Sequence, residues 1–460
     1  MKRLNLLFIL LFLTVNLLLT SCTASESLDL LPVRQLPYPV RNTSDLEFSH
    51  DGIKIAYAIE CSDQPGIWIA DQDGSHPQQI QEIKRPEPWP CPTPGPFLTL
   101  PAITPGSRGT SEPRRYWEDY NAPVWSPDDK KLAYSRSMSS WNGGVFDCHT
   151  TGEERLCPGS VVYDLVTNEY ISLDMMAGLS FSPDSQKVAL FRECTLDWTA
   201  DTCVDISPES AQLVEDGFGL HVLDLHTRKV VYKDIEAVLD LDYRWRGQAF
   251  RWSSDGQALC YPTYIDSSPD DDEYGRPRGR IRLAWLGDPG RRIDIEGMEC
   301  AWNPQAEQIV YIVYPSARYY INDQKTKYII HSVEMRIYDP IMQEERVVFT
   351  GEVVPFRNQF SPMKWSPNGK CIAFKFDPLL DDNVLDNPPR VGASPDIQQR
   401  IYVINVESGE YRETDVFAYG VGSWMEWNQS GDKLYVPYGK TKEDSSRWTY
   451  LEISVPELCN

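Results

Sequence analysis

The residues that could perform catalysis do not form a recognisable catalytic motif in this chain. A serine nucleophile on a strained turn needs Gly-x-Ser-x-Gly, and Gly422-Ser423-Trp424 lacks that spacing. No glycine-rich phosphate loop occurs in the sequence either. The six histidines are scattered, at His50, His76, His149, His221, His226 and His331. The sequence therefore predicts no catalytic residue and no histidine-bound metal ion.

Two acidic runs contain the residue types that bind calcium. They are Asp266, Asp270, Asp271, Asp272 and Glu273, and Asp377, Asp381, Asp382, Asn383 and Asp386. Oxygen ligands at close spacing suit Ca²⁺, but neither run follows the twelve-residue calcium-loop pattern. We expect solvated surface acids and no cofactor, with calcium as the alternative. Glycoside hydrolysis by a pair of carboxylates is a further alternative, because the separation of the two carboxylates is a property of the fold and not of the sequence.

The first residues have the form of an export signal with a lipidated cysteine. Lys2 and Arg3 supply positive charge, and an apolar run follows over 6–19. Leu19-Thr20-Ser21-Cys22 resembles the lipobox of bacterial lipoproteins, which implies cleavage before Cys22 and lipidation of its side chain. Each buried CH₂ of an acyl chain contributes ~0.8 kcal/mol to membrane binding. The alternative is an ordinary signal peptide with an incidental Cys22.

This signal sets the expected domain boundaries and the charge of the mature chain. We expect a lipoprotein signal peptide over 1–21, a lipidated tether over 22–31 and a single domain over 32–460. Removing the signal takes away two basic residues and no acid, so the formal net charge of −23 becomes −25. Such an anionic surface repels nucleic acid, and we expect no nucleic-acid partner.

A ten-residue figure recurs seven times and organises the rest of the chain. Each copy has an aromatic residue, a tight turn and a short apolar strand, and the copies begin at Phe48, Trp125, Phe181, Trp252, Trp302, Trp365 and Trp427. In turns such as Ser366-Pro367-Asn368-Gly369, proline presets φ and glycine tolerates a positive φ. A unit that recurs at roughly 50–80 residues indicates a repeat architecture.

Each unit has enough strands for one blade of a propeller. A third strand is predicted after each hairpin, over 66–70, 161–165, 220–225, 281–285, 335–338, 401–404 and 448–453. Most units then add a turn and a short fourth strand, so the sequence predicts an all-β, seven-bladed β-propeller of four-stranded antiparallel blades. The seventh unit ends near Val455. We therefore expect residues 33–37 to supply its fourth strand and to close the ring.

The figure resembles the TolB-type, WD-like β-propeller repeat, whose signature is aromatic-Ser-Pro-Asp-Gly followed by Lys-x-Ile-Ala-Phe. Two turns, Asn303-Pro304-Gln305-Ala306 and Asn428-Gln429-Ser430-Gly431, lack the Asp, and we expect them to be looser. That repeat occurs in scaffolds, in peptidase gating domains and in lyases, so the resemblance implies a fold and not an activity. TolB proper also has an α/β domain ahead of its propeller. Since the first repeat here closely follows the signal peptide, we do not expect that domain or the TolB role.

The remaining cysteines suggest disulfide bonds. The chain has eleven cysteines, so an even number remains beside Cys22, as is common in exported proteins. In two pairs the cysteines are nine residues apart, and each pair is predicted to form a disulfide bond within one loop: Cys148 with Cys157, and Cys194 with Cys203. The propeller arrangement suggests three further pairs: Cys61 with Cys91, Cys371 with Cys459, and Cys260 with Cys300.

The long connections of the predicted propeller all lie on one face, at 80–120, 136–159, 193–217, 262–279, 314–333 and 376–399. Loops on a rigid scaffold often bind ligands, although long loops are also tolerated without a function. The 86–105 segment is rich in proline, which lowers the entropy that it loses on binding. Aromatic residues on this face suit protein or carbohydrate contact, and we take as binding candidates Trp89, Phe97, Tyr116, Trp117, Trp141 and Trp198.

Together these features predict a lipid-anchored propeller at the bacterial cell membrane or outer membrane, acting as a non-catalytic binding or scaffold module. We expect a monomer whose ligand is an envelope protein or a glycan. The alternative is an enzyme acting on envelope or extracellular glycans or peptides, with carboxylates in the propeller funnel. Convergent, partly buried carboxylates in a deep channel would favour the enzyme, and an aromatic, proline-rich rim would favour the binding module.

Overall fold

The fold is described from a computed structural model of the chain. The described residues are 33–36, 43–59, 64–82, 116–120, 123–140, 149–151, 154–156, 159–174, 176–192, 219–237, 250–266, 278–305, 308–321, 327–353, 363–376, 400–414, 425–439, 448–455 and 457–459. No helix among them is long and apolar enough to cross a membrane.

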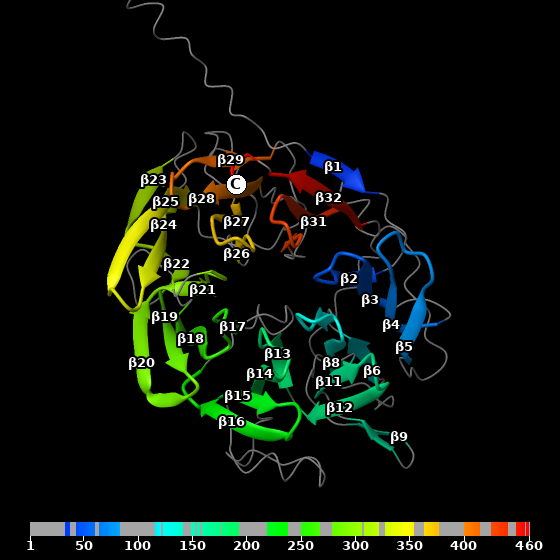
Figure 1. Cartoon of the computed structure of the whole chain (residues 1–460). Coiled ribbons are helices and arrows are strands. Elements are labelled where there is room, and N and C mark those ends of the chain that lie inside the picture. The colour runs from blue at the N-terminus through cyan, green and yellow to red at the C-terminus, as the bar shows by residue number, and fades with distance from the viewer. Residues whose placement is uncertain are drawn as a thin grey trace, which may run out of the picture.

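Seven antiparallel sheets stand in a ring around a central axis, which confirms the predicted seven-bladed β-propeller (Figure 1). Blade 1 has β2 (Thr43–Phe48), β3 (Lys54–Ile59), β4 (Gly66–Asp71) and β5 (Gln78–Glu82). Blade 2 has β7 (Val124–Trp125), β8 (Lys131–Ser140), β11 (Gly159–Asp164) and β12 (Glu169–Asp174). Blade 3 has β13 (Met176–Phe181), β14 (Lys187–Arg192), β15 (Gly219–Asp224) and β16 (Lys229–Asp234).

The remaining blades follow in chain order around the ring. Blade 4 has β17 (Arg251–Trp252), β18 (Ala258–Asp266), β19 (Arg278–Trp285) and β20 (Asp288–Glu296). Blade 5 has β21 (Met298–Trp302), β22 (Ile309–Val313), β24 (Lys327–Asp339) and β25 (Glu344–Val353). Blade 6 has β26 (Lys364–Trp365), β27 (Cys371–Phe376), β28 (Arg400–Asn405) and β29 (Tyr411–Glu413). Blade 7 has β30 (Glu426–Trp427), β31 (Lys433–Gly439), β32 (Trp448–Ser454) and β1 (Val33–Leu36).

Some of the predicted long loops contain strands instead. β6 (Tyr116–Tyr120) pairs with the far half of β8, and β23 (Ala317–Ile321) pairs with the early part of β24. A separate hairpin joins β9 (His149–Thr151) to β10 (Glu154–Leu156). These strands extend blades 2 and 5 beyond the repeat, because an exposed length of β8 or β24 offers backbone groups that a neighbouring segment can satisfy.

The turn between the first two strands of each blade is closed by the residues that the repeat supplies. In blade 2 the Ser126 hydroxyl donates to Asp128 at 2.6 Å and accepts the Lys131 amide at 2.8 Å. For the blade-7 turn, which also lacks the Asp, the expectation of a looser turn is wrong. The amide oxygen of Asn428 accepts the Lys433 N–H at 3.0 Å, as the Ser126 hydroxyl accepts that of Lys131. An asparagine in the place of serine therefore keeps this turn closed. The blade-5 turn includes residues outside the described ones, so the expectation for it stays a prediction.

The tryptophans of the repeat tie each blade to the one before it. The indole N–H of Trp125 donates to the Glu47 carbonyl at 3.2 Å, and the indole of Trp365 donates to the Ala301 carbonyl at 3.1 Å. Trp252 and Trp427 make the same bond to the carbonyls of Ser180 and Lys364, both at 3.1 Å. The hydrophobic clusters likewise join residues of neighbouring blades, so the core lies between the sheets.

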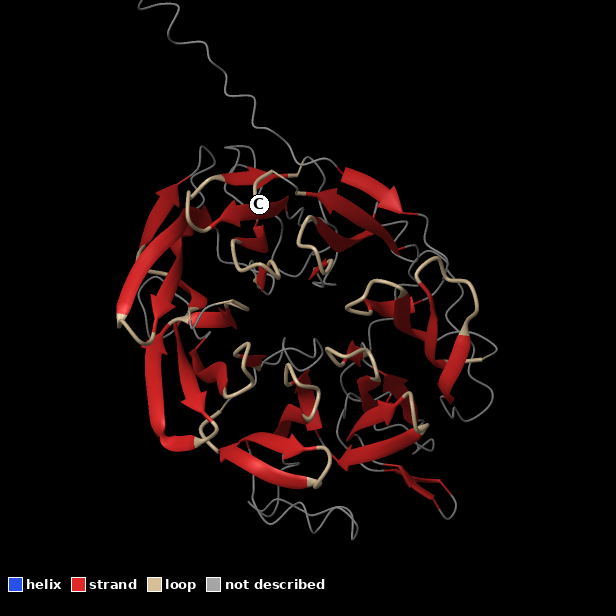
Figure 2. Cartoon of the chain, viewed as in Figure 1, coloured by secondary structure: helices blue, strands red, loops and turns tan. Residues whose placement is uncertain are grey.

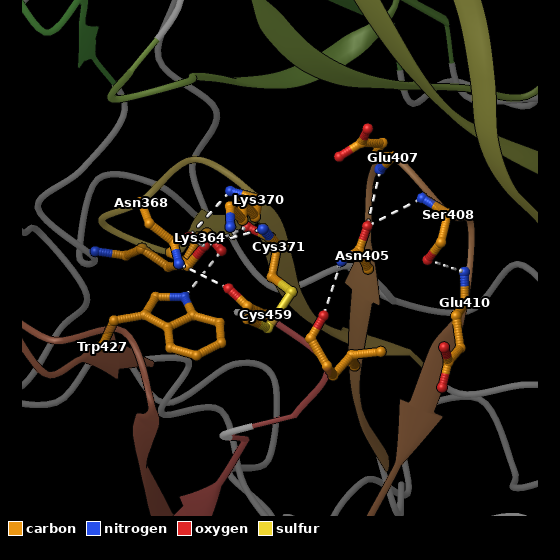
Figure 3. The surroundings of a disulfide bond; sticks show 12 residues. Lys364, Asn368, Lys370, Cys371, Asn405, Glu407, Ser408, Glu410, Trp427 and Cys459 are labelled. Carbon is orange, nitrogen blue, oxygen red and sulfur yellow. Dashed lines mark hydrogen bonds between the residues drawn. A yellow bond between two sulfur atoms is a disulfide. The ribbon is translucent and has the colours of Figure 1, made fainter.

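The ring closes at the chain termini in two ways. β1 pairs antiparallel with β32, from Val33 opposite Ile453 to Leu36 opposite Tyr450, as predicted for residues 33–37. The C-terminal tail then crosses to blade 6, where a disulfide joins Cys371 to Cys459 (Figure 3). The amide of Asn368 donates to the Cys459 carbonyl at 2.7 Å in the same place. A second disulfide joins Cys260 of blade 4 to Cys300 of blade 5, so both of these predicted pairs are confirmed.

Replacing both Cys371 and Cys459 by alanine is expected to lower the free energy of unfolding by about 2–4 kcal/mol. The two residues are 88 apart in sequence, and the bond restricts the unfolded chain over that length. Denaturant unfolding of wild type and variant, without reductant, measures the difference. Removal of the Cys260–Cys300 bond, which spans 40 residues, is the matched control and is expected to have a slightly smaller effect. Equal denaturant midpoints for wild type and the Cys371/Cys459 variant would show that this disulfide does not stabilise the fold.

Candidate functional site

Seven residues occupy equivalent positions on the innermost strands of the blades, and we call them the axial ring. Each directly precedes the aromatic residue of its repeat, and they are Glu47, Val124, Ser180, Arg251, Ala301, Lys364 and Glu426. The turns that follow the inner strands, drawn tan in Figure 2, gather around the centre of the ring. Because the repeat places these residues in equivalent positions, residues that are far apart in the sequence lie on neighbouring inner strands, as Lys364 and Glu426 do.

An open cavity of about 230 Å³ lies at the inner strands of blades 3 to 6. Ser180 and Ala301 are the small ring residues on its wall, and Arg251 and Lys364 are the large ones. The walls are otherwise mainly apolar, and they include the repeat tryptophans of blades 4, 5 and 6. The cavity is thus a mostly apolar space with two cationic side chains on its wall.

On the other side of the ring, two carboxylates approach Lys364. The Nζ atom of Lys364 lies 2.8 Å from a carboxylate oxygen of Glu426, and these side chains are 16% and 28% exposed. Glu47 is buried, and its carboxylate accepts the Trp125 backbone N–H at 3.2 Å. Burial raises the pKa of Glu47 well above its usual value, and the Glu426 charge adds to this, while Lys364 acts in the opposite direction. The ring therefore holds one carboxyl that resists ionisation beside a lysine–carboxylate pair.

Replacing Glu47 by glutamine is expected to stabilise the protein at neutral pH. Because the folded-state pKa is raised, ionisation of Glu47 destabilises the fold at pH values above the unfolded-state pKa of about 4.3. This cost grows by about 1.4 kcal/mol for each pH unit until the folded-state pKa is reached. Glutamine keeps an oxygen that can accept the Trp125 N–H and carries no charge. The gain should grow as the pH rises from 4 to 8 and should vanish at pH 3.

Thermal unfolding at a series of pH values measures this gain. Glu407→Gln, at an exposed turn of blade 6, is the control and is expected to change the melting temperature little. A Glu47→Gln variant that is less stable than wild type at pH 7 would show that the charged form is the one that the fold favours.

The binding candidates predicted from the sequence lie almost entirely beyond the described residues. Tyr116 and Trp117 are in β6, opposite Ser140 and Ser139 of β8. The other binding candidates and the predicted loop cysteines lie outside the described residues: Trp89, Phe97, Trp141, Trp198, Cys61, Cys91, Cys148, Cys157, Cys194 and Cys203. Cys22 and most residues of the two acidic runs also lie outside them. These assignments therefore remain predictions. Within the described part of the chain, no group of three or more His, Cys, Asp or Glu side chains could hold a metal ion.

The axial ring itself was missed by sequence reasoning. The signal for it is present, because aligning the seven repeats places Glu47, Arg251, Lys364 and Glu426 in one column directly before the aromatic. A column that mixes charges with Val, Ser and Ala is unexpected for a buried strand position. Reading the repeat by columns, and not only by its turn motif, would have identified these residues.

Comparison with known proteins yields similarity of fold alone. No known family model matches the chain, and no curated protein matches it. Solved structures that resemble it include TolB from Acinetobacter baumannii, with 14% identity over 81% of this chain and 66% of that one and a TM-score of 0.37. An oligogalacturonate lyase in complex with manganese has 12% identity over 74% of this chain and 91% of that one, with a TM-score of 0.32.

An acylaminoacyl peptidase from Pyrococcus horikoshii also resembles the chain, with 12% identity and a TM-score of 0.40, over 70% of this chain and 43% of the peptidase. The chain thus spans less than half of the peptidase and about two thirds of TolB. At such low identities the likeness concerns the β-propeller fold, and the activities and the metal in these names belong to those proteins.

Proposed function

We propose that the protein is a non-catalytic binding or scaffold module, anchored at the bacterial envelope through a lipid on Cys22. The observation that carries this proposal is the difference between the two faces of the propeller. Because the strands of a blade are antiparallel, its first and third turns share one face and its second connection lies on the other. The turns on the first face are short and closed by hydrogen bonds, whereas the strand ends on the opposite face are separated in sequence by long stretches, such as 193–218 and 377–399.

The rigid blades support this proposal because they fix the points from which the long connections start. Inter-blade indole bonds, buried clusters and two disulfides hold neighbouring blades together. Loops that start from a fixed frame lose less entropy when they bind. Recognition is proposed for the segments 80–120, 136–159 and 193–217, with an envelope protein or glycan as ligand.

The disulfides also support export. Disulfide bonds persist in oxidising compartments and are rare in a reducing cytosol. The half-cystines of both bonds are buried, and each bond joins two blades. Membrane fractionation with metabolic fatty-acid labelling tests the anchor: wild type should be labelled and sediment with membranes, and Cys22→Ser should lose the label. A Cys22→Ser variant that is still labelled would overturn the lipid assignment.

The binding role is tested by crosslinking in intact cells followed by affinity purification and mass spectrometry. The variant replaces residues 86–105 by a short Gly-Ser linker, and the matched control replaces exposed Glu407 and Ser408 on the short-turn face by alanine. A partner captured by wild type and by the control, but lost with the linker variant, is the expected result. Equal capture by all three folded proteins would reject this segment as the binding site.

The second candidate function is an enzyme, and the carboxylates of the axial ring are the observation in its favour. A carboxyl of raised pKa near a second carboxyl group is an arrangement used in general acid and base catalysis. We favour binding because Glu47 is only 7% exposed and its carboxylate is occupied by the Trp125 N–H. Hydrolysis of an envelope glycan or peptide by wild type, abolished in Glu426→Gln, would establish the enzyme instead.

A further inference from the structure

We infer that the short-turn face, the end of the blades that carries their first and third turns, is the surface that faces the membrane, and that it fits a zwitterionic lipid bilayer. The inference rests on the proposed anchor at Cys22. It deepens the proposed function, because it decides which face remains open to a partner. It follows from the place where the described chain begins and from the side chains around that place.

The described chain begins on the short-turn face. β1 is the outermost strand of blade 7, and its first residue, Val33, lies opposite Ile453 near the end of β32 (Figure 1). β32 ends on this face, because the N–H of Val455, which follows it, donates to the carbonyl of Asp432 in the first turn of the blade at 2.8 Å. A chain that enters β1 at Val33 therefore arrives from the short-turn face.

The C-terminal tail confirms which end of the blades this is. The amide of Asn405, where the third turn of blade 6 begins, donates to the Leu458 carbonyl at 2.8 Å (Figure 3). The next residue, Cys459, is bonded to Cys371, which follows the first turn of the same blade. Both ends of the described chain thus lie at the short turns.

A lipid on Cys22 would hold this face close to the bilayer. Cys22 and Val33 are eleven positions apart, so a fully extended chain spans at most about 40 Å between them. The seven residues of β31, which runs from one face to the other, already span about 23 Å. To bring the long connections to the bilayer, the chain would have to run back along blade 7 for more than half of its reach.

Exposed apolar side chains lie in the turns of this face. Ile53 is in the first turn of blade 1, and Val166 is in the third turn of blade 2. Ile341 and Met342 are in the third turn of blade 5. The four side chains are 61% to 69% exposed, in turns that usually carry polar residues. Their blades are within two places of blade 7 in the ring, so these residues flank the anchored blade and can enter the headgroup region of a bilayer.

The charges of this face favour a bilayer without net charge. The third turns carry both signs, with exposed acids such as Asp73, Glu407 and Glu410 and exposed bases such as Arg228. Anionic headgroups would repel a chain whose formal net charge is −23. A zwitterionic surface offers both signs to these turns and accepts the apolar side chains between them.

This orientation narrows the class of partner. The strand ends that lead into the long connections, such as Arg192 of β14 and Phe376 of β27, lie at the opposite end of the blades from the short turns. The long connections then point away from the membrane that holds the anchor. Their ligand is a water-soluble protein or glycan that approaches from the aqueous side, and not a lipid of the same membrane.

Energy transfer to a dye on the lipid headgroups tests the orientation. The lipoprotein is reconstituted in phosphatidylcholine vesicles that carry the acceptor dye, with one donor dye attached through an azide-bearing amino acid at Asp73 or at Glu82. Both positions are exposed in blade 1, and they form a matched pair because Asp73 is in the third turn and Glu82 is at the other end of β5. Transfer from Asp73 should be at least about twofold more efficient, since the five residues of β5 span about 17 Å.

Serine substitutions test the apolar contact. Ile53→Ser combined with Val166→Ser should bring the transfer from Asp73 closer to that from Glu82. Val231→Ser, at an exposed position within the outer strand of blade 3, is the control and should leave the transfer unchanged. Equal transfer from Asp73 and Glu82, or stronger transfer from Glu82, would overturn the orientation. Unchanged transfer in the serine variant would overturn the apolar contact.

A second form of attachment separates this inference from the proposed anchor. The mature chain with a histidine tag in place of the lipid is held on the same vesicles by a nickel-chelating lipid, and the same difference between Asp73 and Glu82 is expected. Failure of the anchor would appear as absent fatty-acid labelling with this difference intact. Failure of the orientation would appear as equal transfer from both positions in the tagged chain.

Discussion

Replacing Trp125 by alanine is expected to lower the free energy of unfolding by about 3–5 kcal/mol. Trp125 is 2% exposed and packs in the cluster between blades 1 and 2, with residues that include Ala56, Ile67 and Leu132. Truncation leaves a cavity between two sheets that meet only through side chains, and their backbones cannot readily collapse into it. It also leaves the Glu47 carbonyl, which now accepts the indole N–H at 3.2 Å, without that donor.

The indole hydrogen bond can be separated from the packing by substitution with phenylalanine. Trp125→Phe loses the N–H donor and part of the ring, and is expected to be destabilised by about 1 kcal/mol more than Trp302→Phe. In Trp302 the indole N–H has no acceptor among the described residues, so its removal should relieve an unsatisfied group. Urea unfolding of the two variants and of wild type gives the comparison. Equal losses in both would show that the inter-blade indole bonds contribute little.

Replacing Arg282 by methionine is expected to destabilise the protein by about 3–5 kcal/mol at neutral pH. Arg282 of β19 is 8% exposed, and its guanidinium lies 2.9 Å from Asp234 of blade 3 and 2.7 Å from Asp294 of β20. The Tyr261 hydroxyl also donates to Asp234 at 2.6 Å. Since the Asp234 side chain is only 2% exposed, removing the guanidinium leaves a buried carboxylate without its counter-ion.

The pH dependence of this effect has a definite sign. The hydrogen bonds from Arg282 lower the pKa of Asp294, and although burial alone would raise the pKa of Asp234, bonds from Tyr261 and Arg282 lower it. Carboxylates with lowered folded-state pKa values stabilise the fold above their unfolded-state value of about 3.9, and this contribution is lost as the pH falls through the folded-state pKa. The gap between wild type and Arg282→Met should therefore narrow below pH 4.

An exposed ion pair serves as the control for Arg282. Arg318 lies 2.9 Å from Glu352, and these side chains are 55% and 47% exposed. Solvent screens such a pair, so Arg318→Met is expected to change stability by no more than about 1 kcal/mol. A loss at Arg282 no larger than the loss at Arg318 would show that the buried network does not hold blades 3 and 4 together.

The architecture was accessible from the sequence because its determinants are local. Each repeat carries its own turn residues, such as Ser126 and Asp128, whose side chains accept backbone N–H groups within five residues. Each also carries an aromatic and an apolar strand, and seven copies leave few arrangements besides a closed ring. The strand at Val33–Leu36 could be assigned because the last blade lacked one strand and an open edge is unfavourable.

The contacts between blades were decided only by the tertiary structure. Arg251 and Lys364 are more than a hundred residues apart, and they line one cavity because blades 4 and 6 both flank blade 5 in the ring. The same holds for Arg282 and Asp234, which belong to different blades. β6 and β23 were taken for loops because they continue no repeat and form only against the extended parts of β8 and β24. Sequence periodicity reports which strands form, whereas the site depends on which side chains face one another across the ring, and that is a property of the assembled blades.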